Sequence, residues 1–154
     1  MMNRLAGLIL LVTTVACGSG GSTAPDIATA TFGSALNVNL SSMTKTASGL
    51  YYRDSIIGTG TVAASGDSVR VHYIGWLANG QQFDNSFQNG SPIAFRLGRG
   101  RVIPGWDEGL VNMRAGGWRK LIIPPSLGYG GTSNGPIPGN SILVFNVQIV
   151  SVIK

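Results

Sequence analysis

Residues 68–77 constrain the fold most strongly, because their apolar residues alternate with a period of two, as in a β-strand with one buried side. The residues on that side are Val69, Val71, Tyr73, Gly75 and Leu77. Asn79-Gly80 follows this stretch, and the dipeptide favours a type I′ hairpin turn before a returning strand that starts at 82–84. The chain is therefore expected to be built on antiparallel strands.

The other expected elements complete one sheet and one helix. Short strands are predicted at 93–97 and 118–123, and a long strand closes the chain at 141–154. The closing strand places these apolar residues on one side: Leu143, Phe145, Val147, Ile149 and Ile153. A helix is predicted at 104–113, because Pro104 suits a first helical turn and apolar residues share one helical face. These residues are Trp106, Leu110 and Met113. The expected class is α+β, with the helix laid across the apolar face of an antiparallel sheet.

The composition agrees with this class and excludes several kinds of protein. The 23 glycines and 7 prolines suit many tight turns, and the 11% of charged residues is too low for a charge-rich disordered chain or a coiled coil. The net charge of +5 comes from scattered basic residues, with Arg96, Arg99 and Arg101 as the nearest cluster. We therefore expect a basic surface and no nucleic-acid site. One cysteine and one histidine exclude an intrachain disulfide, a multi-cysteine zinc site and the usual multi-histidine metal centres, and no metal or cofactor is expected.

Residues 1–16 are predicted to be a signal peptide. Arg4 precedes an apolar run at 5–16, which is shorter than the about 20 helical residues that span a bilayer core. This arrangement fits the hydrophobic core of a signal peptide behind a positively charged start. The protein is therefore expected to be exported.

Residues 17–43 are predicted to be a lipidated cysteine followed by a flexible linker. Ala16 before the lone Cys17 resembles a bacterial lipobox, although Thr14 stands where such motifs usually have leucine. Thr14 and Ala16 would also suit an ordinary signal peptidase, and both alternatives export the protein. The segment at 18–25 has linker composition, and 26–43 shows no helical period. The folded domain is expected to span 44–154.

Three motifs that suggest other chemistry lack the context they need. Gly131–Gly135 matches G-x-S-x-G, but no acid or histidine follows Glu108, so an esterase triad cannot be completed. Asp107 and Glu108 are adjacent and do not face each other on a helix, so they are assigned to helix N-terminal electrostatics. His72 lies on the side of its strand opposite Tyr73, and a solvated or capped histidine is expected there.

Aromatic residues on separate elements predict one apolar hollow. They are Tyr73, Phe83, Phe95, Trp106, Tyr129 and Phe145. The helix and the closing strand would carry Trp106 and Phe145 to the same apolar face, beneath a loop at 126–140 that is long for so small a domain. An apolar hollow with few polar groups is a common ligand site, and Asp84 is the acid expected at its rim.

Ordered motifs resemble the FKBP-type peptidyl-prolyl cis–trans isomerases over about residues 45–153. The motifs are Val71-His72-Tyr73-x-Gly75, Gly80-x-x-Phe83-Asp84-x-Ser86, Val102-Ile103-x-Gly105-Trp106-x-Glu108-Gly109, Gly128-Tyr129-Gly130, Ile137-Pro138 and Leu143-Val144-Phe145. Upstream, Ser48–Tyr52 and Gly58–Gly60 resemble the entry of bacterial members. The resemblance implies a twisted antiparallel sheet wrapped around one short α-helix.

The resemblance also implies a set of site residues. Those expected to be catalytic are Tyr73, Phe83, Asp84, Trp106, Tyr129 and Phe145, and those expected to help bind the substrate are Phe95, Val102, Ile103 and Ile137. Trp106 would form the floor beneath the substrate proline. The Ile103 N–H and the Tyr129 hydroxyl would donate to substrate carbonyls, and Asp84 would orient polar groups at the rim.

The sequence departs from the family pattern at the edges of this site. Ile93 stands where members often have an aromatic wall residue, and Leu127 replaces a second loop tyrosine found in some members. The flap loop is about one residue shorter than in the best-known members, which leaves the alignment open across 132–136.

The expected function is isomerisation of Xaa-Pro bonds in exported polypeptides, without metal or cofactor. The alternative is a module that binds proline-containing segments without turnover, and a purely structural surface lipoprotein leaves the aromatic hollow unexplained. The expected partners are proline-containing polypeptides, macrolide inhibitors and a membrane reached through the lipid on Cys17. A monomer is expected, because no long helical segment precedes the domain.

Overall fold

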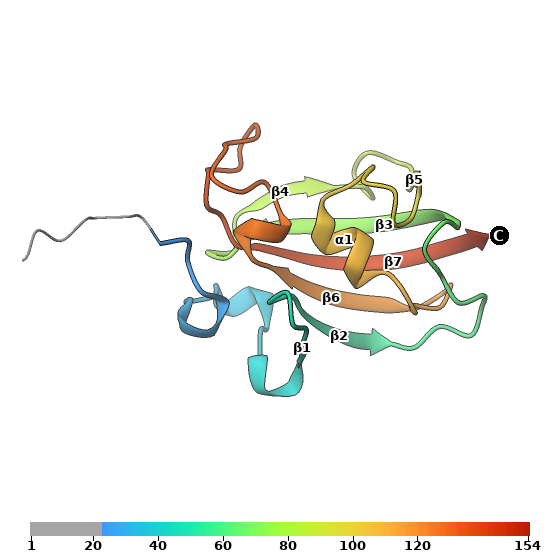
Figure 1. Cartoon of the computed structure of the whole chain (residues 1–154), viewed down its shortest axis with the longest axis horizontal. Helices are drawn as coiled ribbons and strands as arrows, with labels where there is room; N and C mark the ends of the chain where they lie inside the picture. The colour runs from blue at the N-terminus through green and yellow to red at the C-terminus, as the bar shows by residue number, and fades with distance from the viewer. Residues whose placement is uncertain (1–22) are drawn as a thin grey trace, which may run out of the picture.

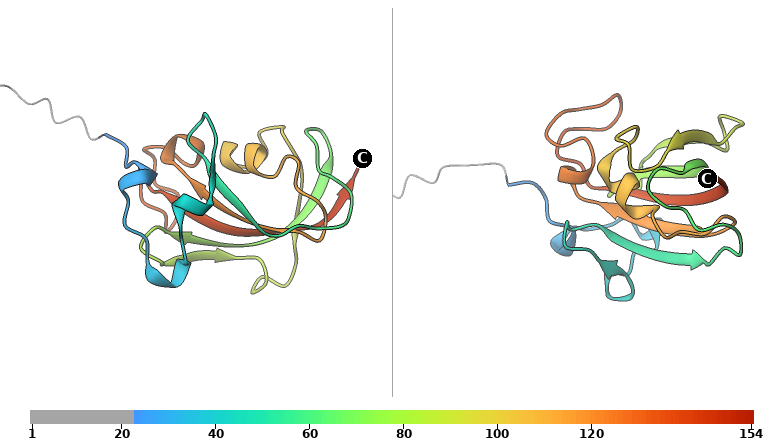
Figure 2. Two further views of the ribbon diagram at one scale, coloured as in Figure 1. Left: turned by 90° about the horizontal axis from the view of Figure 1, so that it is seen from below. Right: turned by 45° about the vertical axis from the view of Figure 1, so that its right-hand side comes forward.

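The computed structural model describes residues 23–154, so the predicted signal peptide and Cys17 lie outside the described part (Figure 1). Seven strands form one antiparallel sheet in the order β1-β2-β6-β7-β3-β4, and β5 pairs with β3. The strands are β1 (Thr44–Lys45), β2 (Tyr51–Ile56), β3 (Ser68–Leu77), β4 (Gln82–Asn85), β5 (Ile93–Arg96), β6 (Trp118–Ile123) and β7 (Leu143–Ile153). The sheet curves around the helix α1 (Pro104–Gly109), which confirms the expected α+β class (Figures 1 and 2).

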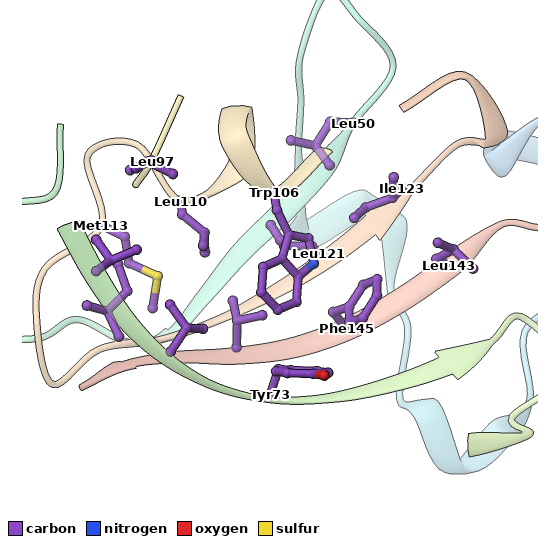
Figure 3. Packing of buried hydrophobic residues seen from close by; sticks show 14 of the residues in the cluster. Leu50, Tyr73, Leu97, Trp106, Leu110, Met113, Leu121, Ile123, Leu143 and Phe145 are labelled. Atoms are coloured by element: carbon purple, nitrogen blue, oxygen red, sulfur yellow. The ribbon is translucent and has the colours of Figure 1, made fainter. Parts of the chain in front are cut away.

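The face of the sheet under α1, here called the inner face, carries the main core. On β3 the side chains alternate between buried and less buried as the sequence pattern predicts. The buried residues of β3 meet those of β6 and β7 beneath the helix (Figure 3). No helix in the described range has the length and apolar character needed to cross a bilayer.

The turn after β3 differs from the predicted type I′ geometry. A type I′ turn needs positive φ at both central residues, and of the pair Asn79-Gly80 only Gly80 has it, with φ of 94°. The Gly80 N–H donates to the Leu77 carbonyl, and the Leu77 N–H donates to the Gln81 carbonyl, each at 2.9 Å. This is a three-residue hairpin loop that ends in a left-handed glycine.

The closing strand β7 also departs from simple alternation. Its register against β3 shifts between Arg70 and Val71, where Val150 is the extra residue. Because one inserted residue exchanges the two faces of a strand, Ile153 is 61% exposed and not in the core as predicted. Val152 packs against the inner core in its place.

The helix α1 is shorter than the predicted 104–113, although Leu110 and Met113 remain buried in the turn that follows it. The chain leaves the helical path at Asn112, which has a positive φ of 65°. Two glycines at i and i+4 bring the helix close to β6. A Cβ on Gly105 would lie 2.6 Å from Ile123, and one on Gly109 would lie 2.8 Å from Leu121.

Residues 26–43, here called the strap, are folded, so the prediction of a flexible linker is wrong for this segment. They form three short 3-10 turns, η1 (Ile27–Thr29), η2 (Ser34–Leu36) and η3 (Leu40–Ser42). The strap packs on the outer face of the sheet, opposite α1, where a second cluster consists of Ile27, Leu36, Tyr51, Ile122, Ile142 and Val144. Three-residue turns produce no helical period, which is why the sequence pattern concealed this structure.

Candidate active site

A cavity of about 200 Å³ opens on the inner face of the sheet, between α1, β3, β4, β5 and β7 and the loop after η4 (Pro125–Leu127). Its lining is mostly apolar and aromatic, and consists of Tyr73, Phe83, Asp84, Ile93, Arg101, Val102, Ile103, Trp106, Tyr129 and Phe145. The predicted hollow therefore exists, and it lies where the helix and the closing strand meet.

Trp106 forms the floor of this cavity. Its ring centroid lies 5.0 Å from that of Tyr73 and 5.3 Å from that of Phe145, and both contacts are edge-to-face. Figure 3 shows the indole reaching from α1 toward these two rings. The indole Nε1 is buried without a hydrogen-bond partner among the described residues. Edge-to-face packing from several sides holds the indole in one orientation.

Gly75 explains why β3 has a gap in its apolar side. A Cβ at this position would lie 2.7 Å from both Phe83 and Phe145. These two rings fill the space above the glycine in an edge-to-face pair, with centroids 5.5 Å apart. The missing side chain is therefore what allows two walls of the cavity to meet.

The phenol of Tyr73 and the carboxylate of Asp84 form the polar edge. The Tyr73 hydroxyl donates to Asp84 Oδ2, and Asp84 Oδ1 accepts from the Asn85 N–H at 2.8 Å and from Asn89 Nδ2 at 3.3 Å. Burial, followed by the hydrogen bond to Asp84, raises the pKa of Tyr73 far above its ordinary value. Tyr73 therefore stays a neutral donor, and both oxygens of Asp84 are already engaged.

Two hydrogen-bond donors at the cavity remain available to a ligand. The hydroxyl of Tyr129, a residue that is 37% exposed, makes no hydrogen bond within residues 23–154. The Ile103 N–H precedes the first turn of α1 and likewise has no acceptor there, whereas the Ile103 carbonyl accepts from Trp106 and Asp107. Both donors were predicted to bind substrate carbonyls, and the structure places them at the same cavity.

Asp107 fixes the loop that borders the cavity. Its carboxylate oxygens accept the N–H groups of Gly98 and Gly100, each at 2.8 Å. The sequence assigned Asp107 only to helix electrostatics, because its backbone partners could not be read from the sequence. The loop that it fixes leads into Arg101, a lining residue that the prediction missed although it directly precedes Val102-Ile103.

The structure brings eight of the ten predicted site residues to the cavity and leaves two outside its lining. Phe95 packs against Trp106 with ring centroids 5.9 Å apart, so it supports the floor and does not line the space. Ile137 is buried in the inner core, because its hydrogen bonds with Asn134 fold the flap back on itself. Ile93, which was noted as a departure from the family pattern, lies in the lining.

The residues set aside on sequence grounds have structural roles. The Nδ1 atom of His72 lies 2.9 Å from the Ser86 hydroxyl, and its ring stacks on Phe87 at 4.2 Å, so this histidine is capped as expected. The G-x-S-x-G segment lies in an exposed part of the flap, where neither a strand nor a helix flanks it. Glu108 accepts a hydrogen bond from Ser48, away from the cavity.

The lining of the cavity holds no serine, cysteine, histidine or lysine that could act as a nucleophile. Its rings and two free donors suit an apolar ring between two carbonyl groups, which describes a prolyl residue in a polypeptide. The fold and the site thus define a domain of twisted sheet and short helix whose cavity fits a prolyl ring. The family model for "FKBP-type peptidyl-prolyl cis-trans isomerase" matches residues 60–150, and the chain belongs to this family.

Relatives agree with this assignment. FK506-binding protein 2 of Dictyostelium discoideum is 52% identical over 89 residues, which are 57% of this chain and 67% of that protein. The FKBP-type peptidyl-prolyl cis-trans isomerase FkpA of Buchnera aphidicola is 45% identical over 107 residues, which are 70% of this chain and 42% of that protein. The chain thus spans about half the length of several relatives that it matches.

Solved structures support the same fold. The crystal structure of FkpA from Escherichia coli matches with a TM-score of 0.68 and 44% identity, over 73% of this chain and 52% of that one. The crystal structure of AtFKBP13 matches with a TM-score of 0.68 and 38% identity, over 71% of this chain and 97% of that one. The predicted fold and the predicted isomerase family are therefore confirmed.

Proposed function

We propose that this protein accelerates cis–trans isomerisation of Xaa-Pro bonds in exported polypeptides by binding the proline ring over Trp106. The observation that carries this proposal is an aromatic cavity of about 200 Å³ whose two free donors, Ile103 N–H and Tyr129 O–H, border the same space. The family assignment favours turnover over the alternative of a binding module without catalysis.

The cavity can lower the barrier without covalent chemistry. Rotation about an amide costs about 18–20 kcal/mol, because resonance gives the C–N bond double-bond character. The planar amide is more dipolar than the twisted one, so transfer from water to an apolar site disfavours the planar ground state more. Only such differential stabilisation raises turnover, and a difference of about 4 kcal/mol gives roughly a thousandfold acceleration.

The two free donors, Ile103 N–H and Tyr129 O–H, would also orient the substrate peptide. A substrate carbonyl on each side of the proline can accept from Ile103 and Tyr129, which fixes the two ends of the peptide while the bond between them turns. The hydrogen bond from Tyr73 holds the Asp84 carboxylate at the rim. The position of this carboxylate is therefore set before the substrate binds.

A protease-coupled assay on a proline-containing peptide tests the proposed activity. We expect the protein to accelerate the slow phase that follows cis–trans isomerisation, and a macrolide ligand of the family to abolish the acceleration. Binding of the same peptide with no change in the slow phase would support the non-catalytic alternative and overturn the proposal.

We also propose that the protein is a membrane-anchored lipoprotein, periplasmic or at the cell surface, that acts as a monomer. The anchor is supported by the apolar run at 5–16, which ends in Ala16 directly before Cys17. These residues lie outside the part of the chain that the structure describes. Mass spectrometry of the mature N-terminus decides between the two processing routes. A diacylglyceryl-modified Cys17 supports the membrane anchor, whereas an unmodified N-terminus would mean that the protein is exported without a lipid anchor.

Substitution of Asp84 by asparagine tests the polar edge. We expect kcat/KM to fall by about tenfold, because the charge-assisted hydrogen bond from Tyr73 becomes a neutral one. The pKa of Tyr73 should fall toward its ordinary value while burial still holds it above that value, and ultraviolet titration of the phenol measures this. An unchanged Tyr73 pKa would contradict the contribution of Asp84.

Substitution of Tyr129 by phenylalanine removes one donor and leaves the ring in place. We expect kcat/KM to fall about three- to tenfold, the usual effect of one neutral hydrogen bond. Stability should not change, because the hydroxyl has no partner within the described chain. Urea denaturation and the coupled assay measure the two effects, and a loss of stability without a loss of activity would assign Tyr129 to the fold instead.

A further inference from the structure

A second cavity lies on the outer face of the sheet, between the strap and strands β3, β6 and β7. Its volume is about 460 Å³, compared with about 200 Å³ for the cavity on the inner face. We call it the outer cavity, and its lining consists of Ala35, Leu36, Asn37, Trp76, Gly80, Lys120 and Asn146. The proposed isomerase activity uses none of these residues.

Lys120 is a buried cation without an anionic partner. The residue is 8% exposed, and its Nζ donates to the Leu36 carbonyl and, at 3.5 Å, to the Asn37 carbonyl. Buried lysines are normally paired with a carboxylate. The salt bridges found within residues 23–154 join Arg119 to Asp54 and Lys154 to Asp67, so neither reaches Lys120.

The electrostatic environment of Lys120 also indicates that an anionic partner is missing. Burial, together with the nearby positive charge of Arg53, lowers the pKa of Lys120. The lining of the outer cavity includes no aspartate or glutamate. An anion in the cavity would therefore be the first opposite charge to reach this ammonium group.

Several hydrogen-bond donors at the cavity have no acceptor among the described residues. An ammonium group has three N–H donors, and the described residues supply acceptors to two of them. Asn146 is the cross-strand partner of Lys120 and lies on the same face. Its side-chain amide and the indole N–H of Trp76 make no hydrogen bond within residues 23–154. Donor groups of Lys120, Asn146 and Trp76 thus border one space and are available to a ligand.

We propose that the outer cavity binds a small organic carboxylate with an apolar body. The carboxylate oxygens would accept from Lys120 Nζ and the Asn146 amide, which supplies the missing negative charge and acceptors for both donors. The apolar body would lie against the indole of Trp76 and the side chains of Ala35 and Leu36. A volume of about 460 Å³ is within the range of small-molecule sites in proteins.

Phenylacetate and its neutral counterpart phenylacetamide are matched probes for this site. Titration of the protein by nuclear magnetic resonance should shift the amide signals of Leu36, Lys120 and Asn146 with phenylacetate. The dissociation constant should be at least about tenfold lower for phenylacetate than for phenylacetamide, the effect of one charge-assisted hydrogen bond. Equal affinities for the two probes, or shifts confined to the inner face, would overturn the proposal.

Lys120→Met keeps the apolar stem and removes the charge, so it should abolish the preference for phenylacetate. Asn146→Leu should weaken phenylacetate binding severalfold while the charge remains, and it tests the site even if the lysine variant does not fold. Lys45→Met is the matched control, because it removes an exposed cation that lies over Tyr51 and does not line the cavity. A loss of preference in this control equal to that in Lys120→Met would assign the effect to net charge and contradict the site.

Discussion

Replacement of Trp106 by alanine is expected to lower kcat/KM on a proline-containing peptide by about a hundredfold or more, which corresponds to about 2.7 kcal/mol of transition-state stabilisation. The indole is the floor of the cavity, and the rings of Tyr73 and Phe145 pack on it edge-to-face. Its removal both widens the cavity and frees these rings to move. Water would then reach the bound amide, and the apolar environment that disfavours the planar ground state would be lost.

The same substitution should also destabilise the fold, because truncation of a buried tryptophan costs about 3–5 kcal/mol. Trp106→Leu is the milder variant, since it keeps part of the volume, and it should still lower kcat/KM by more than Asp84→Asn or Tyr129→Phe. Urea denaturation and the coupled assay, both at a temperature where the variant is folded, separate the two effects.

Met113→Ala is the matched control for core damage. Met113 is buried in the same inner core but does not line the cavity. The Met113→Ala variant should lose about 2–5 kcal/mol of its free energy of unfolding and retain the kcat/KM of the unmodified protein. If Met113→Ala lost as much activity as Trp106→Ala, the effect would belong to general loosening of the core and not to the floor of the site.

The sequence predicted best those elements with a regular pattern or a clear end. Alternation located β3, which buries its inner side under α1, and β6, which is buried on both faces beyond Trp118, has the predicted bounds 118–123 because Pro124-Pro125 end the strand. Where a single residue breaks the alternation, prediction failed. The bulge at Val150 moved Ile153 to the surface, and the register of a strand pair is set by the partner strand, which a local pattern does not contain.

The aromatic residues of the site could be predicted because large rings need to be buried. Large rings on separate elements must bury their area together, so their convergence followed from the expected sheet and helix. The contributions of the backbone could not be foreseen. Asp107 accepts hydrogen bonds from the N–H groups of Gly98 and Gly100, and the fold of the flap buries Ile137. Both features depend on loop conformations that residue types alone do not determine.

Removal of the strap is expected to destabilise the domain strongly while leaving the active site intact. The family model begins at residue 60, so the strap lies outside the part that defines the family, yet it buries Ile27 and Leu36 against the outer face. Burial of such side chains contributes about 1.5–3 kcal/mol each. A chain that begins at residue 44 should therefore lose about 3–6 kcal/mol compared with one that begins at residue 23.

The loss should appear as a lower urea midpoint and a fall in Tm of about 10 °C or more. Below that temperature the shortened chain should keep its kcat/KM, because the strap and the cavity lie on opposite faces of the sheet. Leu36→Ala gives a point test of the same contact, with about 2–5 kcal/mol lost. Thr44→Ala is the exposed control and should change little. Equal stability of the two chain lengths would mean that the strap rests on the sheet without stabilising it, and that the domain begins near residue 44 after all.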